Sequence, residues 1–105
     1  MQIIPLQPVP NQTLQVTLAG QSCAINVYQK FYGVFVDLYV GGTLIIGGVI
    51  AENLNRIVRD AYLGFVGDLA FYDTQGESDP TYAGLGTQFI LLYIEEADQS
   101  QIKAA

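Results

Sequence analysis

Residues 34–50 read VFVDLYVGGTLIIGGVI, and this stretch decides the fold class. Every second residue of its first half is aliphatic: Val34, Val36, Leu38 and Val40. A period of two sends alternate side chains to opposite faces of a β-strand. Gly41-Gly42 then supplies two residues that tolerate the positive φ angles of a tight turn. The stretch predicts a β-hairpin of strands 34–40 and 43–50, with Gly47-Gly48 as a bulge or sharp bend.

The same alternation continues on both sides of this hairpin. Residues 13–18 and 23–28 alternate around Ala19-Gly20-Gln21, which predicts a second hairpin, and strand character returns over 61–73. Residues 88–95 are apolar on both faces, which indicates a central strand under another layer or an intermolecular contact. Between the strands we expect a connector with one helical turn over 51–60 and a turn-rich loop over 74–87.

These elements predict an all-β chain. We expect a small single-domain antiparallel β-barrel or β-sandwich of about six to seven strands, spanning residues 1–105. Residues 1–11 hold three prolines and are expected to form an N-terminal arm, while the polar residues 97–105 are expected to form a flexible tail.

The composition excludes several classes of function. Of the 105 residues, 50% are hydrophobic and only 13% are charged, with a net charge of -6. This is the wrong sign for binding a phosphate backbone, so no nucleic-acid recognition is expected. The best candidate for a membrane span, residues 38–51, is shorter than the roughly 17 residues that a helix needs, so no membrane partner is expected either. The chain has no histidine, which leaves only carboxylates and hydroxyls for catalysis near neutral pH.

The strongest chemical motif is a group of three carboxylates: Asp73, Glu77 and Asp79. Such oxygens can ligate calcium, but their spacing does not match an EF-hand loop, and we interpret them as an acidic, solvated turn. Glu95 and Glu96 are adjacent and would point to opposite faces of a strand, which makes a poor catalytic pair. The sequence therefore predicts a protein that is not an enzyme and has no catalytic residues, metal site or cofactor.

The second half of the chain carries a family resemblance. Residues 61–69 (AYLGFVGDL), 71–76 (FYDTQG), 79–82 (DPTY) and 84–86 (GLG) resemble, in order and spacing, the baseplate plug proteins of contractile-tailed bacteriophages of the cyanophage type. The opening residues 3–6 (IIPL) and 8–12 (PVPNQ) are similar to theirs as well. The resemblance implies a small, β-rich, non-enzymatic structural protein of the virion that is made in the host cytoplasm. It also implies hub and spike proteins of the tail baseplate as partners, and a homo-oligomer, such as a trimer around the tail axis.

A structural role in an assembly agrees with the shortage of charge, because partners cover the apolar surface. The expected interface residues are large and apolar or aromatic: Tyr39, Tyr82, Leu85, Leu92 and Ile94. The alternative is a small β-domain that binds a carbohydrate or another small ligand through an aromatic patch, for which the tyrosine content is the only sign.

Overall fold

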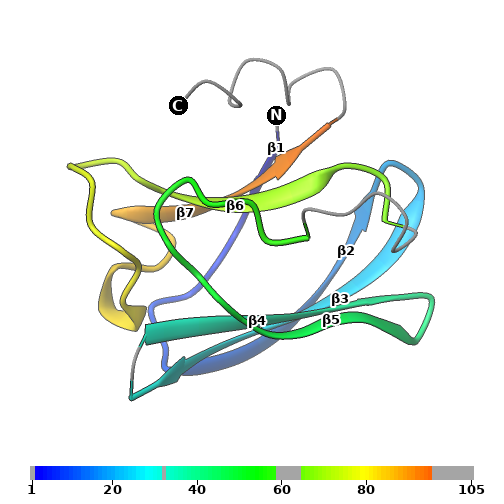
Figure 1. Cartoon of the computed structure of the whole chain (residues 1–105), viewed down its shortest axis with the longest axis horizontal. Helices are drawn as coiled ribbons and strands as arrows, with labels where there is room; N and C mark the ends of the chain where they lie inside the picture. The colour runs from blue at the N-terminus through cyan, green and yellow to red at the C-terminus, as the bar shows by residue number, and fades with distance from the viewer. Residues whose placement is uncertain (1, 32, 59–64, 96–105) are drawn as a thin grey trace.

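The computed structural model describes residues 2–31, 33–58 and 65–95. Seven strands and one short 3-10 turn, Tyr82–Gly84, lie in this described part of the chain (Figure 1). The strands are β1 (Gln2–Ile4), β2 (Asn11–Leu18), β3 (Gln21–Lys30), β4 (Gly33–Val40), β5 (Thr43–Ile50), β6 (Asp68–Asp73) and β7 (Phe89–Ile94). No helix of the described residues is long and apolar enough to cross a membrane.

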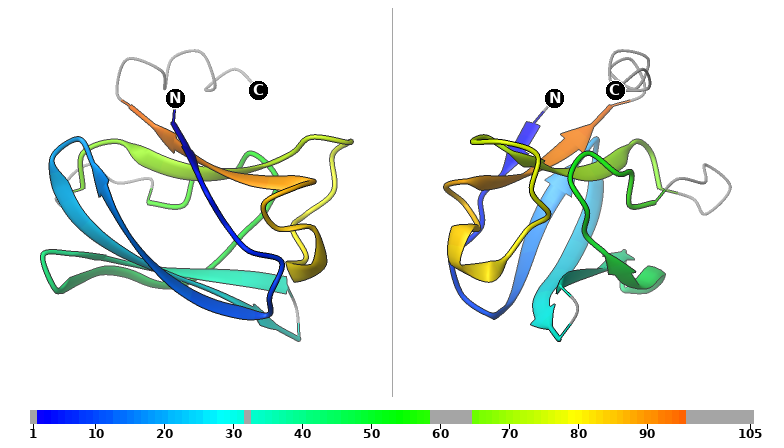
Figure 2. Two further views of the ribbon diagram at one scale, coloured as in Figure 1. Left: turned by 180° about the vertical axis from the view of Figure 1, so that it is seen from behind. Right: turned by 60° about the vertical axis from the view of Figure 1, so that its left-hand side comes forward.

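The strands form two antiparallel sheets that pack face to face (Figure 2). The larger sheet has the order β2-β3-β4-β5, and the smaller has the order β1-β7-β6. Neither sheet closes on itself or on the other, so the fold is a sandwich with open edges and not a barrel. The prediction of an all-β antiparallel fold is confirmed.

Both predicted hairpins are present in the larger sheet. Ala19 and Gly20 have φ angles of 50° and 76°, and Gly41 and Gly42 have φ angles of 57° and 82°. Two consecutive positive φ angles are typical of the turn that matches the twist of a two-residue hairpin. The predicted irregularity in β5 is also confirmed, because the pairing of β4 with β5 shifts register opposite Gly47-Gly48.

Two segments differ from the expectations. The segment expected as an N-terminal arm contains β1, which pairs with β7 on the side opposite β6. The helical turn expected within 51–60 is wrong for the described residues 51–58, which run along the free edge of β6. There the backbone amides of Leu54 and Ile57 donate to the carbonyls of Phe71 and Leu69, bonds that an isolated helical turn cannot replace. Residues 59–64 and the expected tail, 97–105, lie outside the described residues.

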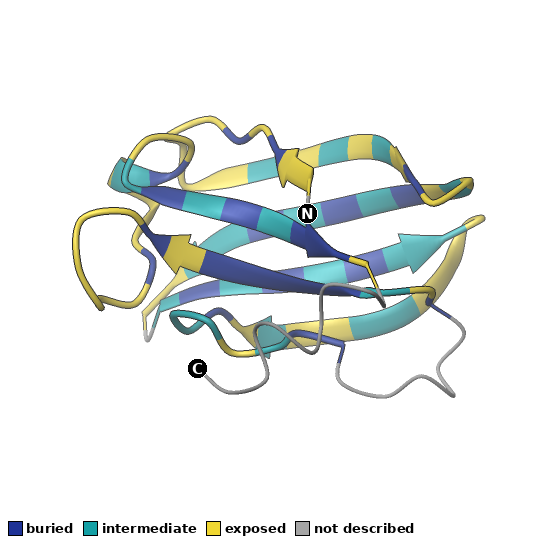
Figure 3. Ribbon diagram, turned by 90° about the horizontal axis from the view of Figure 1, so that it is seen from above, coloured by how far each residue is buried: buried dark blue, intermediate teal, exposed yellow. Residues whose placement is uncertain are grey.

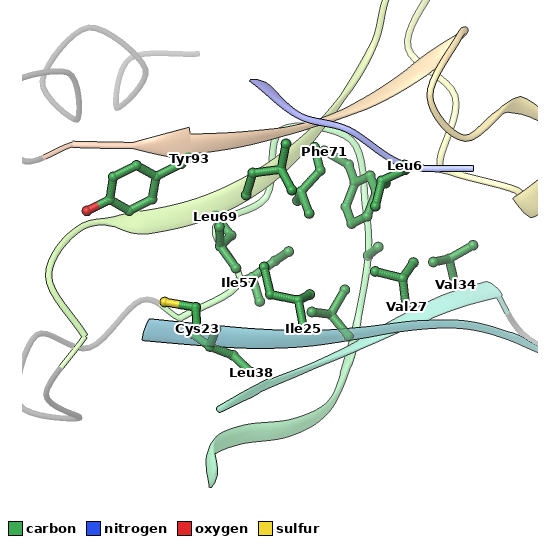
Figure 4. Packing of buried hydrophobic residues seen from close by; sticks show 14 of the residues in the cluster. Leu6, Cys23, Ile25, Val27, Val34, Leu38, Ile57, Leu69, Phe71 and Tyr93 are labelled. Atoms are coloured by element: carbon green, nitrogen blue, oxygen red, sulfur yellow. The ribbon is translucent and has the colours of Figure 1, made fainter. Parts of the chain in front are cut away.

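The core lies between the two inner faces, and buried positions alternate with less buried ones along β3 and β4 (Figure 3). In Figure 4, Leu69, Phe71 and Tyr93 of the smaller sheet point towards Cys23, Ile25, Val27 and Leu38 of the larger one. Strand β7 is the central strand of its sheet, as predicted, but its outer positions Ile90 and Leu92 are only half-buried, so the further layer predicted to cover them is not formed by the described residues. Burial raises the pKa of the Cys23 thiol, which therefore stays protonated as a small core residue.

Two side chains join the sheets at one end of the sandwich. The amide group of Gln21 donates to the carbonyl of Val66 and accepts from its backbone amide, at 3.2 and 2.9 Å. The hydroxyl of Tyr93 donates to the same carbonyl. The segment before β6 is therefore held to both sheets, which fixes the start of that strand.

Candidate interaction surface

The buried carboxylates of the smaller sheet accept hydrogen bonds from backbone amides. Asp68 is buried, and its Oδ1 accepts from the amides of Val58 and Leu69, both at 2.7 Å. Asp73 is buried as well and accepts from the amides of Gln75 and Ser78, both at 2.8 Å. Burial works to raise the pKa of Asp73, but these hydrogen bonds outweigh it and hold the pKa below its ordinary value. Both carboxylates thus accept hydrogen bonds that fix loop geometry.

The acidic turn does not assemble a cation site. Asp79 lies against the 51–58 segment, where its Oδ1 accepts from the amide of Asn53 at 3.0 Å. Asp73 faces inward into its own turn, and Glu77 is exposed. No group of three or more metal-ligating carboxylate, thiol or imidazole side chains occurs among the described residues. The turn is held together by hydrogen bonds from neutral donors.

Apolar side chains gather instead at the end of the sandwich that carries the β3–β4 hairpin. We call them the hairpin-end cluster, with members Val9, Phe31, Ile50 and Tyr82. Phe31 lies at the hairpin tip and is 95% exposed, and the other three are 36–41% exposed. Large apolar side chains grouped on one exposed surface are typical of protein–protein interfaces.

Gln29 brings the segments of this cluster together. Its backbone amide donates to the carbonyl of Pro10 at 2.8 Å, and its side-chain Oε1 accepts from the amide of Tyr82 at 3.1 Å. The Ile50 side chain lies against Gly33 on the other strand of the hairpin. In Figures 1 and 2, the β1–β2 loop, the β3–β4 hairpin and the loop before β7 lie at the same end of the molecule.

A stacked aromatic pair supports the hairpin from the outer face of the larger sheet. Tyr28 and Phe35 are register partners, and their rings stack at 6.1 Å between centroids. The ammonium group of Lys30 lies 5.6 Å from the centre of the Tyr28 ring. These contacts stabilise the strand ends that carry Phe31.

A second apolar surface covers the outer side of the smaller sheet, and we call it the small-sheet face. Ile3 of β1 pairs with Leu92 of β7, and Tyr72 of β6 pairs with Ile90. Ile3 is 59% exposed and Tyr72 39%, while Ile90 and Leu92 are half-buried. The outer face of the central strand β7 is therefore open at these positions.

The five interface residues expected from the sequence fall in different environments. Tyr82 belongs to the hairpin-end cluster, Leu92 lies on the small-sheet face, and Tyr39 lies on the outer face of the larger sheet beside Leu44. Leu85 and Ile94 are 1% and 0% exposed, so their side chains contribute to the interior of this chain.

The two tyrosines do not form one patch. Tyr39 pairs with Ala24, whereas Tyr82 is bonded to Gln29, which lies five positions further along β3. At about 3.3 Å per residue, these anchor points on β3 are about 16 Å apart. An aromatic platform for a sugar is therefore not assembled from Tyr39 and Tyr82.

The sequence analysis missed Phe31, the most exposed large apolar side chain described. Its signal was its position: an aromatic residue between two predicted strands, where turns favour glycine, asparagine and other small polar residues. A bulky ring that is 95% exposed at a turn is typical of a residue that contacts another protein.

Comparison with known proteins agrees with this picture of an interaction protein. A family model described as cyanophage baseplate Pam3 plug gp18 matches residues 1–96. Comparison with curated protein sequences finds no match. The family indicates a structural role in the phage tail baseplate, in association with other baseplate components. The match covers every described strand, and the chain belongs to the cyanophage baseplate plug family.

Proposed function

We propose that the protein is a non-catalytic plug that docks on the hub and spike proteins at the centre of a contractile-tail baseplate. The observation that carries this proposal is Phe31, which lies 95% exposed at the tip of the β3–β4 hairpin. Aromatic anchors of this kind dominate binding energy when they enter a pocket of a partner. Tyr82 and Val9 add partly exposed apolar surface at the same end of the sandwich.

Apolar surface on more than one side of the molecule supports an enclosed position. Besides the hairpin-end cluster, the small-sheet face carries Leu92, and Tyr39 lies beside Leu44 on the larger sheet. Tyr82, Leu92 and Tyr39 are then contacts to different neighbours. Leu85 and Ile94 act from within the chain, by holding the segments that present these contacts.

The state of the carboxylates supports a role without catalysis. Asp68 and Asp73 are committed to backbone amides, as described above, and Glu95 is exposed at the end of β7. An acid–base pair needs two carboxyl groups that face a common space with different pKa values.

The protein is made in the host cytoplasm and carried in the virion as part of the tail. A three-fold arrangement of copies around the tail axis stays a prediction.

Co-expression with the hub protein of the same tail-gene cluster tests the proposal. We expect a stable complex, whose mass by light scattering gives the ratio of the two proteins. Phe31→Ser should lower its yield at least tenfold, because a central aromatic anchor contributes about 2 kcal/mol or more. Val66→Ser is the matched control, since Val66 is 52% exposed at the opposite end of the sandwich.

Two results would contradict the proposal. A wild-type chain that ignores the hub would remove the plug function. Equal loss of binding in Phe31→Ser and Val66→Ser would keep the plug function but move the contact away from the hairpin-end cluster.

A further inference from the structure

The edges of the two sheets are not equally protected against pairing with another chain. An open edge presents unpaired backbone N–H and C=O groups, which proteins usually hide or interrupt. The edge strand β1 has only three residues and is followed by Pro5. Strand β6 is covered by residues 53–58, and β5 is interrupted at Gly48, whose amide is bonded to Asp37. Three of the four edges are therefore blunted.

No described residue protects the fourth edge, β2, in any of these ways. It pairs with β3 in eight consecutive positions without a register shift. Its sequence, NQTLQVTL, contains no charge, proline or glycine. A long, regular and uncharged edge strand is a ready template for intermolecular β-pairing.

The alternation of hydrogen-bonded positions along β2 shows which of its backbone N–H and C=O groups are available to another strand. The Gln29 amide donates to the carbonyl of Pro10, so Pro10 is bonded towards β3. Because bonded and non-bonded positions alternate in an antiparallel pair, the even-numbered residues of β2 face β3. The N–H and C=O groups of the odd-numbered residues point away from the sheet: Asn11, Thr13, Gln15 and Thr17.

Charge limits what can occupy this edge. The first charged residue of the chain is Lys30, so β1, β2 and the loop between them carry no charge, although the whole chain has a net charge of -6. Figure 3 shows β1 and β2 along the same side of the molecule. Two copies that meet along this side keep their acidic residues apart.

We propose that the occupant is a second copy of this chain, whose β2 pairs antiparallel with β2 about a two-fold axis at Gln15. Each Thr13 then lies opposite Thr17 of the second copy, and each Leu14 lies opposite Val16. Both are favourable cross-strand pairs. In this register the outward-pointing backbone N–H and C=O groups of Thr13, Gln15 and Thr17 in one copy face those of the other copy. Leu14 and Val16 are only half-buried in the single chain, and pairing covers them further. The result is a continuous eight-stranded sheet across two copies of the four-stranded one.

Analytical ultracentrifugation of the full chain over a range of concentrations tests the dimer. We expect a monomer–dimer equilibrium, because one strand pair buries less surface than a permanent dimer needs. A chain that stays monomeric at every concentration would overturn the proposal and leave the edge to an extended segment of another protein. A trimer would overturn it in favour of three-fold assembly.

A pair of double variants tests the register. T13K/T17K puts lysine opposite lysine at both symmetry-related positions, and should weaken the dimer about tenfold. T13K/T17E puts lysine opposite glutamate and should restore the affinity or exceed it. Thr13 and Thr17 both lie on the exposed face of β2, so circular dichroism should show the same folded state in both double variants.

Equal weakening in the two double variants, or no change in either, would contradict the register. Phe31→Ser separates the dimer from the proposed function, since it should lower hub binding and leave dimerisation unchanged. The dimer and the plug function can therefore fail independently of each other.

Discussion

The carboxylate of Asp37 accepts a hydrogen bond from the backbone amide of Gly48 at 2.7 Å, across the irregular pairing of β4 with β5. The same carboxylate accepts from Tyr28 Oη at 2.9 Å and from Asn26 Nδ2 at 3.2 Å. Asn26 Oδ1 in turn accepts from the Thr13 hydroxyl at 2.9 Å. One polar network therefore crosses all four strands of the larger sheet and orders the bulge that blunts the β5 edge.

Asp37→Ala should destabilise the protein by about 1–3 kcal/mol, because the Gly48 amide and the Asn26 side chain lose a charged acceptor. The bulge should loosen first, so that hydrogen exchange accelerates at Gly48 before the rest of β5. Denaturant unfolding and amide exchange measure the two effects. The control is Thr74→Ala, which removes a hydroxyl bonded to Gln88 O in the other sheet. If Gly48 exchanges no faster in Asp37→Ala than in this control, Asp37 does not order the bulge.

Stability should fall at acid pH through Asp37 and Asp73. Burial works to raise the pKa of each, but the hydrogen bonds to the carboxylates outweigh it, and both pKa values are lowered in the folded chain. Their stabilisation is therefore complete above the unfolded pKa of about 3.9, and is lost as pH falls through the lower folded value.

Urea unfolding at a series of pH values from about 5 to about 2 measures this loss. Asp73→Asn cannot take up the proton and should show a shallower dependence of unfolding free energy on pH than the wild type. Thr74→Ala, a change in the same turn that removes no titratable group, is the control and should keep the wild-type slope. An unchanged slope in Asp73→Asn would show that this carboxylate does not link folding to pH.

The hairpins could be predicted because their signals are local. Alternation fixes which side chains face the core, and Gly41-Gly42 or Ala19-Gly20 fixes the turn, all within about twenty residues. The pairing of β1 with β7 joins Ile4 to Leu91, at opposite ends of the chain, and no local pattern encodes such a contact. The partition of strands between two sheets was unpredictable for the same reason.

The interaction surface was predictable only in part. Tyr82 was expected from its residue type, but its place at the hairpin end depends on the hydrogen bond between its backbone amide and the distant Gln29 side chain. Leu85 and Ile94 have the same apolar character as exposed interface residues, and sequence cannot show that the chain itself covers them. The exposure of a side chain depends on the tertiary structure. Buried and exposed apolar residues can therefore be told apart only when the packing of both sheets is known.

Gly86 should be far less tolerant of substitution than Gly42, although their φ angles of 85° and 82° are nearly the same. A methyl group at Gly42 meets open space, so Gly42→Ala carries only the cost of left-handed backbone, about 1–2 kcal/mol. At Gly86 the added carbon would overlap the carbonyl oxygen of Leu6, a core residue before β2. Gly86→Ala should therefore cost more than Gly42→Ala in thermal unfolding, and equal losses would mean that the Leu6 segment moves away freely.

Two lysine substitutions in β7 should separate folding from binding. Ile94 is fully buried, so Ile94→Lys buries an ammonium group without a partner and should prevent folding. Leu92 is half-buried on the small-sheet face, where a lysine can extend its charge into solvent. Leu92→Lys should therefore fold, with a loss of about 1–2 kcal/mol in stability, but bind baseplate partners less well.

Thermal unfolding and co-purification with the hub protein measure the two properties. Leu92→Gln is the matched control, because it removes the apolar contact without adding charge. Weaker binding in both variants would assign the small-sheet face to an apolar contact, and loss in Leu92→Lys alone would indicate a contact that is sensitive to charge. Normal binding by both folded variants would remove the small-sheet face from the interface and leave the hairpin-end cluster to hold the plug.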